Sequence, residues 1–116
     1  MGKRLIKENE VNKAMVFVYI TCKDKEEAKK ISRLLFEKRL IACSNYFPIE
    51  SMYWWNDKIH DDKEFVIIAK TIKENFKIIN EEVKKTHSYD VPCICMFDSH
   101  DDKNYQEWIH KEVKRG

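Results

Sequence analysis

The segment 14–22, AMVFVYITC, constrains the fold more than any other part of this sequence. β-Branched and aromatic residues follow one another there without polar alternation, which is typical of a strand whose two faces both meet apolar groups. Phe17 and Tyr19 would point to one face of a sheet, and Val18 between them to the other. The rest of the chain must therefore cover both faces of the sheet that contains this strand.

Regular patterns predict the other elements. Asp24 and Glu27 have the spacing of a capping box, which indicates that a helix begins there and runs to about residue 39. Asn56 and Asp57 both tolerate positive φ, so they are expected to form the tight turn of a hairpin. Pro48 favours an edge position for the first hairpin strand. The expected elements are strands at 14–22, 40–55, 58–71 and 93–98 and helices at 24–39, 74–86 and 105–113.

This order predicts an α+β fold of the ferredoxin-like type, β-α-β-β-α-β, with an extra C-terminal helix. Residues 1–13 are polar and are expected to be a leader before a single domain at 14–116. Two helices cover only one face of the sheet, and the ribbon of Tyr53, Trp54 and Trp55 would be a free apolar edge. We therefore expect an obligate homo-oligomer that buries both surfaces.

Composition argues against several classes of function. Gly occurs only at positions 2 and 116, so no glycine-rich loop can hold nucleotide phosphates. The 22 Lys and Arg residues are interspersed with 20 Asp and Glu residues, which favours neither a nucleic acid nor a membrane as partner. No window is apolar enough to cross a membrane and the first residues do not resemble a secretory signal, so we expect a cytoplasmic protein. No catalytic constellation is identifiable, and we expect no enzyme.

Several short motifs occur in the order and spacing of the CutA family, the divalent-cation (copper) tolerance proteins. The chain resembles this family from about residue 15 to residue 114. The resemblance implies a ferredoxin-like fold, a tight homotrimer whose interface includes the ribbon of Tyr53, Trp54 and Trp55, and a cytoplasmic location. The motifs are ACSN at 42–45, YWWNDKI at 53–59, KT at 70–71, HSYDVP at 87–92 and YQEWI at 105–109.

The metal site that the resemblance implies is only partly present in this chain. His87 matches the family's histidine, but Ser88 replaces the proline that usually follows it, which predicts a looser backbone there. Cys93 stands where members with a proposed copper site often carry an acid. The family's proposed cysteine ligand falls near Ile20 and not on Cys22.

We predict His87, Cys22 and Cys93 as ligands of copper or another divalent ion, held for sequestration or sensing without an organic cofactor. Thiolate and imidazole together suit Cu(I), or Zn(II) if three or four ligands converge. Each residue also has a structural alternative. His87 could cap the last carbonyls of the second helix, and Cys93 could pack in the core as a small apolar group. Cys22, at the end of a strand, is the thiol expected to be most accessible.

A second hypothesis is a trimer for small-ligand signalling, similar to the PII-type regulators that share this architecture. Such a protein would bind its effector, a nucleotide or an organic acid, in clefts between subunits near Lys58, Lys70, Tyr89 and His87. A third hypothesis, an RNA-recognition module, would require a monomer with an exposed aromatic sheet face and a basic body.

Overall fold

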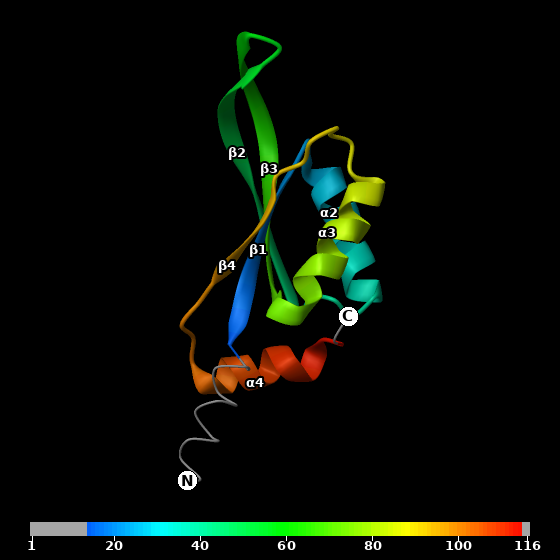
Figure 1. The fold of residues 1–116 in the computed structure, drawn as a ribbon, viewed down its shortest axis with the longest axis vertical. Helices are drawn as coiled ribbons and strands as arrows, with labels where there is room; N and C mark the ends of the chain where they lie inside the picture. Colours follow the sequence, from blue (N-terminus) through cyan, green and yellow to red (C-terminus); the bar gives the residue numbers. More distant parts are fainter. Residues whose placement is uncertain (1–13, 115–116) are drawn as a thin grey trace.

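The computed structural model describes residues 14–114, so the predicted leader at 1–13 lies outside the described residues. Its four strands form one antiparallel sheet in the order β2-β3-β1-β4, and α2 and α3 lie side by side on one face (Figure 1). The predicted α+β fold with a helix after the last strand is confirmed, whereas the domain boundary at residue 14 stays a prediction. The elements are β1 (Met15–Cys22), α2 (Lys25–Glu37), β2 (Cys43–Trp55), β3 (Lys58–Ile72), a 3₁₀ turn (Lys73–Asn75), α3 (Phe76–Thr86), β4 (Ile94–Asp98) and α4 (Lys103–Glu112).

The start of α2 carries the predicted cap. The side chain of Asp24 accepts a hydrogen bond of 2.9 Å from the backbone N–H of Glu27. The carboxylate of Glu27 reaches back to the N–H of Lys23, one residue before the cap residue itself. This variant of the capping box places Glu27 on the buried side of the helix, where only 8% of the residue is exposed.

The core lies between α2, α3 and the inner face of the sheet. Val18, Ile20 and Cys22 alternate along β1 toward this face, and none of the three is exposed to solvent. Apolar residues that recur on one side of α2 and α3 complete the cluster. The core residues of the two helices are Ala28, Ile31, Leu35, Ile79 and Val83.

The hairpin of β2 and β3 projects far beyond the helices (Figure 1), and the described chain is 58 Å along its longest axis. Asn56 and Asp57 form the turn with φ values of 51° and 62°, as predicted. Pro48 lies in β2 at the edge of the sheet, also as predicted. The large apolar side chains of the outer part of the hairpin, Met52, Tyr53, Trp54, Trp55 and Ile59, are exposed.

The last helix has a role that the sequence pattern did not predict. α4 lies across one end of the sheet (Figure 1), and its Ile109, together with Val113, packs against Met15 and Ile72. These two strand residues point to the face opposite α2 and α3, because Met15 alternates with Val16 along β1. The second face of the sheet is therefore covered at one end by α4.

The remainder of the second face is partly open in the single chain. Phe17 and Tyr19 are half-buried there, and 53% of Phe97 on the neighbouring strand is exposed. The rings of Tyr19 and Phe97 meet edge to face with their centres 6.4 Å apart. An apolar strip thus continues from α4 along the middle of the sheet.

Candidate functional site

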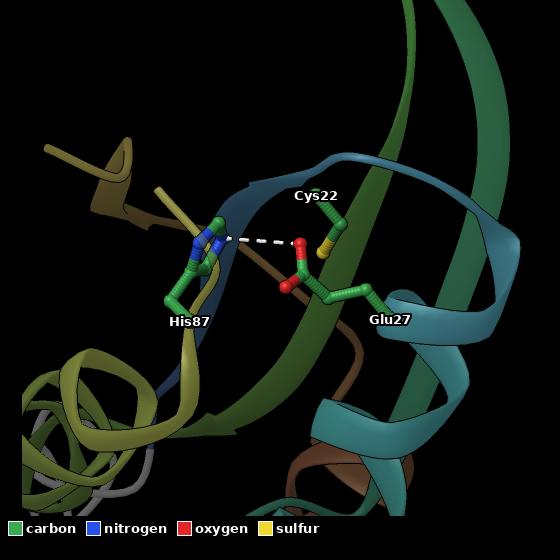
Figure 2. Close-up of side chains that lie close together, drawn as sticks. All are labelled: Cys22, Glu27 and His87. Atoms are coloured by element: carbon green, nitrogen blue, oxygen red, sulfur yellow. Dashed lines mark ion pairs between the residues drawn. The ribbon is translucent and has the colours of Figure 1, made fainter. Parts of the chain in front are cut away.

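Three side chains that can hold a metal ion meet beside the first turn of α2 (Figure 2). They are Cys22 at the end of β1, Glu27 in α2 and His87 directly after α3, and their ligand atoms all lie within 4.8 Å of one another. No other group of three such residues occurs within residues 14–114. The fold thus brings together two of the three predicted ligands, Cys22 and His87, and adds Glu27.

Hydrogen bonds on both nitrogens fix the ring of His87, which is completely buried. Its Nδ1 accepts the backbone N–H of Tyr89 at 3.0 Å, so this nitrogen carries no proton. The proton is then on Nε2, which donates to the carbonyl oxygen of Thr21 at 2.6 Å. His87 caps α3 through its backbone N–H, which donates to the carbonyl oxygen of Val83. Its ring contacts β1 and does not cap the last helical carbonyls.

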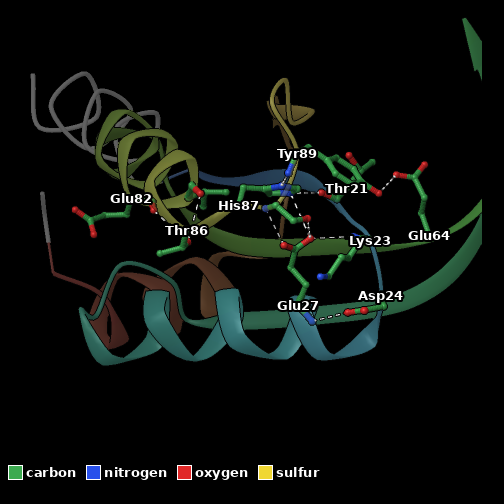
Figure 3. Close-up of polar contacts among 11 residues, drawn as sticks. Thr21, Lys23, Asp24, Glu27, Glu64, Glu82, Thr86, His87 and Tyr89 are labelled. Carbon is green, nitrogen blue, oxygen red and sulfur yellow. Dashed lines mark hydrogen bonds and ion pairs between the residues drawn. The ribbon is translucent and has the colours of Figure 1, made fainter. Parts of the chain in front are cut away.

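The carboxylate of Glu27 ties the histidine loop to α2 (Figure 3). It accepts the N–H of Lys23 and the N–H and hydroxyl of Ser88, at 2.9, 2.9 and 3.0 Å. Burial works to raise the pKa of Glu27, but these hydrogen bonds lower it overall, so the group is ionised at neutral pH. One carboxylate oxygen lies 3.9 Å from Nε2 of His87.

Two of these contacts depend on the departure from the family pattern at position 88. A proline there would have neither the N–H nor the hydroxyl that Ser88 donates to Glu27. These two hydrogen bonds tie Ser88 to α2, whereas the looser backbone expected after the histidine stays a prediction. The sequence identified Glu27 only as a capping residue. The capping-box spacing does not reveal which loop will lie beside the helix, so the role of Glu27 beside the histidine was missed.

Cys22 is completely buried, and the expectation that it is the most accessible thiol was wrong. It shares the side of β1 that Val18 and Ile20 present to the helices, so its position at the strand end does not expose it. Burial above all, and then the charge of Glu27, raises the pKa of Cys22 to about 12. The thiol is protonated at neutral pH and must lose its proton to become a metal ligand.

Cys93 lies outside this cluster. Cys93 is exposed just before β4, so it is not a core residue in the single chain. Its carbonyl accepts the N–H of Thr21 at 3.2 Å. Burial, and then the neighbouring Cys95 and Glu64, raises the pKa of Cys93. A ligand role for Cys93 stays a prediction.

The residues of the alternative ligand cleft lie apart in one chain. Lys58 and Lys70 are at opposite ends of β3, about 40 Å from each other at the rise of an extended strand. The ammonium of Lys70 donates to the hydroxyl of Tyr105 in α4 at 3.2 Å. The hydroxyl of Tyr89 instead donates to Glu64 at 2.6 Å. A cleft with Lys58, Lys70 and Tyr89 would therefore need more than one subunit.

Within the described chain, no helix has both the length and the apolar character needed to cross a membrane.

Comparison with known proteins matches the chain to one family. The profile of the CutA1 divalent ion tolerance protein family covers residues 16–112. A divalent-cation tolerance protein CutA from Archaeoglobus fulgidus is 44% identical over 99 residues, which is 84% of this chain and 97% of that protein. Its counterpart from Pyrococcus horikoshii is 39% identical over 102 residues, which is 87% of this chain and 100% of that protein.

Solved structures agree with the fold. The structure of the periplasmic divalent cation tolerance protein CutA from Archaeoglobus fulgidus has a TM-score of 0.84 and covers 86% of this chain and 99% of its own. CutA1 from Oryza sativa has a TM-score of 0.85 at 32% identity, over 89% of this chain and 96% of its own. The cytoplasmic location expected from the sequence stays a prediction. The chain belongs to the family of CutA1 divalent ion tolerance proteins, which is not a family of enzymes.

Proposed function

We propose that this protein acts in metal tolerance as a homotrimer that binds copper or a related divalent ion, for sequestration or sensing and without chemical turnover. The observation that carries the proposal is the group formed by Cys22, Glu27 and His87. Relatives over most of the chain are named divalent-cation tolerance proteins, which supports the general role.

The donor atoms fit such an ion. A thiolate, a carboxylate and an imidazole nitrogen are ligands of Zn(II) and Cu(II), and the thiolate also suits Cu(I). Three protein ligands leave one position of a tetrahedral site for water or a further ligand. Cys93 stays in the proposal as a ligand that a neighbouring subunit would supply.

Binding of an ion would replace hydrogen bonds that His87 makes in the metal-free chain. Nε2 of His87 would give up its proton and its hydrogen bond to Thr21 in order to ligate. Nδ1 would then have to carry a proton while it faces the N–H of Tyr89, so the turn at 87–89 must shift. The Cys22 thiol would also release its proton. We therefore expect ion binding to move the histidine loop and to release protons.

The proposal of a trimer rests on apolar surface that one chain leaves open. Met52 and Trp54 are each 71% exposed near the tip of the hairpin, and Ile59 is 60% exposed beside them. On the second face of the sheet, Phe97 adds a further exposed ring. Apolar patches of this kind mark surfaces that another protein covers, and three copies of the chain would cover them mutually.

Titration of metal-free protein with Cu(II), Zn(II) and Cu(I), each against a competing chelator, tests the ligand assignment. Cys22→Ser and His87→Gln are expected to lower the affinity at least tenfold. Cys43→Ser is the matched control, because Cys43 is a half-buried thiol outside the cluster. Thermal unfolding of each variant establishes that it is folded. Equal affinity of the three variants and the wild type would contradict the proposed site.

A second candidate, a PII-like signalling trimer, would bind its effector in a cleft between subunits that includes the cavity beside Tyr89. Lys58 and Lys70 would then come from different subunits. A thermal-shift screen with nucleotides and organic acids tests this alternative. A ligand that raises the unfolding temperature supports it, and the absence of any shift contradicts an anionic effector.

A further inference from the structure

Tyr89 contacts both a candidate ion ligand and the base of the projecting hairpin (Figure 3). Its backbone N–H donates to Nδ1 of His87 at 3.0 Å, and the centres of the two rings are 4.8 Å apart. Its hydroxyl donates to Glu64 of β3 at 2.6 Å. The next residue of β3, Phe65, pairs with Cys22 at the end of β1, so Glu64 lies where the hairpin leaves the body of the fold. Both hydrogen bonds of Tyr89 are made within one chain.

The hydrogen bond from Tyr89 to His87 excludes an ion from the histidine. A neutral imidazole has one nitrogen with a free lone pair and one with a proton. If Nδ1 of His87 ligates, its lone pair is on the ion. If Nε2 ligates, the proton moves to Nδ1. In both cases the N–H of Tyr89 loses its acceptor, so the two contacts of His87 are mutually exclusive.

The displacement that follows falls on Tyr89, because Glu27 holds the residue before it. Within the described residues, Oε2 of Glu27 accepts a single hydrogen bond, from the N–H of Ser88 at 2.9 Å. A carboxylate oxygen has two lone pairs, so this atom can ligate an ion and keep its bond to Ser88. The backbone of Tyr89 must then turn away from His87, and its ring and hydroxyl turn with it.

The surroundings of Glu64 allow the hydroxyl of Tyr89 to leave. Glu64 is only 9% exposed, but Lys23 and Lys63 line the same hollow of the surface. Their ammonium groups provide cations for the carboxylate in place of the lost hydrogen bond. The contact between Tyr89 and Glu64 can therefore be exchanged without leaving a charge unpaired.

We propose that Tyr89 is a positioning residue that couples ion binding at His87 to the hairpin. Its bond to Glu64 holds the histidine loop in the arrangement that excludes the ion, and this bond breaks when His87 ligates. The coupling is reciprocal, so loss of the bond to Glu64 favours ion binding. This inference rests on the proposed function and adds to it the surface that would respond to the ion.

Titration of the metal-free, full-length protein with Zn(II) against a competing chelator tests the sign of the coupling. Tyr89→Phe keeps the ring and the backbone N–H and removes only the hydroxyl. We expect its affinity for Zn(II) to rise by about threefold to tenfold over the wild type. A merely structural role of the hydroxyl predicts an unchanged or lower affinity. Tyr53→Phe is the matched control, because the hydroxyl of Tyr53 donates to Asp62, another carboxylate of β3, and its affinity should equal that of the wild type.

Tryptophan fluorescence tests whether the hairpin responds. Trp55 lines the same cavity as Tyr89, so a movement of Tyr89 changes its surroundings. We expect saturating Zn(II) to shift the emission of the wild type and a chelator to reverse the shift. Trp55→Phe should remove the shift.

The outcomes separate this inference from the proposed function. If the wild type binds Zn(II) and Tyr89→Phe binds it equally or more weakly, the coupling is overturned and the proposed function stands. The same holds if the wild type binds Zn(II) without a change in the emission of Trp55. If neither protein binds Zn(II), both proposals are overturned. Binding by Tyr89→Phe alone would support the coupling, since the hydroxyl of Tyr89 would then keep the wild-type site closed.

Discussion

Glu27 joins three parts of the chain that are distant in sequence. Its carboxylate holds the end of β1 through Lys23 and the histidine loop through Ser88, while its own backbone begins α2. The same side chain stands 3.9 Å from the ring of His87. A capping residue therefore also fixes the position of the candidate ligands.

Replacement of this carboxylate should destabilise the fold. Glu27→Gln turns an acceptor of three hydrogen bonds into a group with its own N–H donors, which face the N–H groups of Lys23 and Ser88. We expect the free energy of unfolding to fall by about 1–3 kcal/mol at pH 7. Chemical denaturation at a fixed protein concentration measures the change. Glu26→Gln, in the exposed neighbour, is expected to change it by less than about 0.5 kcal/mol. Equal effects of the two variants would contradict the role of Glu27.

The effect of Glu27→Gln should also depend on pH. The folded state lowers the pKa of Glu27 below its ordinary value of 4.5, so the ionised group stabilises the fold fully above that value. This contribution is lost as the pH falls through the lower, folded-state pKa. The difference in unfolding free energy between wild type and variant should therefore be constant above about pH 5.5 and shrink in more acid solution. A difference that grows on acidification would contradict the assigned charge.

The buried thiol of Cys22 should resist chemical modification. With a pKa of about 12, the thiolate is about one in ten thousand of the population at pH 8, and the side chain has no exposed surface. We expect iodoacetamide to leave Cys22 unmodified in the folded protein while all four cysteines react in denaturant. Mass spectrometry of the peptides measures both. Labelling of Cys22 at the same rate in the folded and unfolded chain would contradict its burial.

Among the elements, the hairpin of β2 and β3 has a turn that the sequence predicts closely. Asn56 and Asp57 both adopt positive φ, a backbone region that is disfavoured for residues other than glycine. Asp57→Gly should relieve this cost and stabilise the protein by up to about 1 kcal/mol. Asp61→Gly, in the regular part of β3, should instead destabilise it. Thermal unfolding compares the two variants, and the same direction of change in both would contradict this account of the turn.

The sequence predicts local elements well because their causes are local. Caps, turn residues and apolar periodicity place each helix and strand to within a few residues of its observed ends. The packing of α4 was not predictable in this way. The spacing of Ile109 and Val113 indicates a helix with one apolar side, but it does not say that this side will cover Met15 and Ile72.

The site was predicted in part for the same reason. The resemblance to a family pointed to His87, and the soft ligand chemistry pointed to Cys22. The alternation of β1 already placed Cys22 on the side of Val18 and Ile20, which is where its burial could have been foreseen. The contact of Glu27 with the histidine loop joins residues 61 positions apart, and no local pattern encodes it.

The described chain is elongated, with dimensions of 58 × 27 × 21 Å, because the hairpin extends past the body (Figure 1). A ribbon with exposed Met52, Trp54 and Ile59 presents apolar side chains far from the core of its own chain. We expect two further copies to bury this ribbon and the open part of the second sheet face.

A charge on the ribbon should therefore disturb the assembly. Trp54→Glu is expected to lower the native mass from three times the 14.0 kDa of one chain, because a buried unpaired carboxylate opposes association. Lys30→Glu, on the exposed side of α2, should leave the mass unchanged. Size exclusion with light scattering measures both. A wild-type monomer that is stably folded and soluble would contradict the expected trimer.

Native mass spectrometry of the protein after reconstitution with copper or zinc measures both the number of chains in the assembly and the number of bound ions. We predict a trimer that carries one ion per chain, through Cys22, Glu27 and His87, and a trimer of Cys22→Ser that carries none. A monomeric wild type, or a Cys22→Ser trimer that retains one ion per chain, would contradict the proposed function.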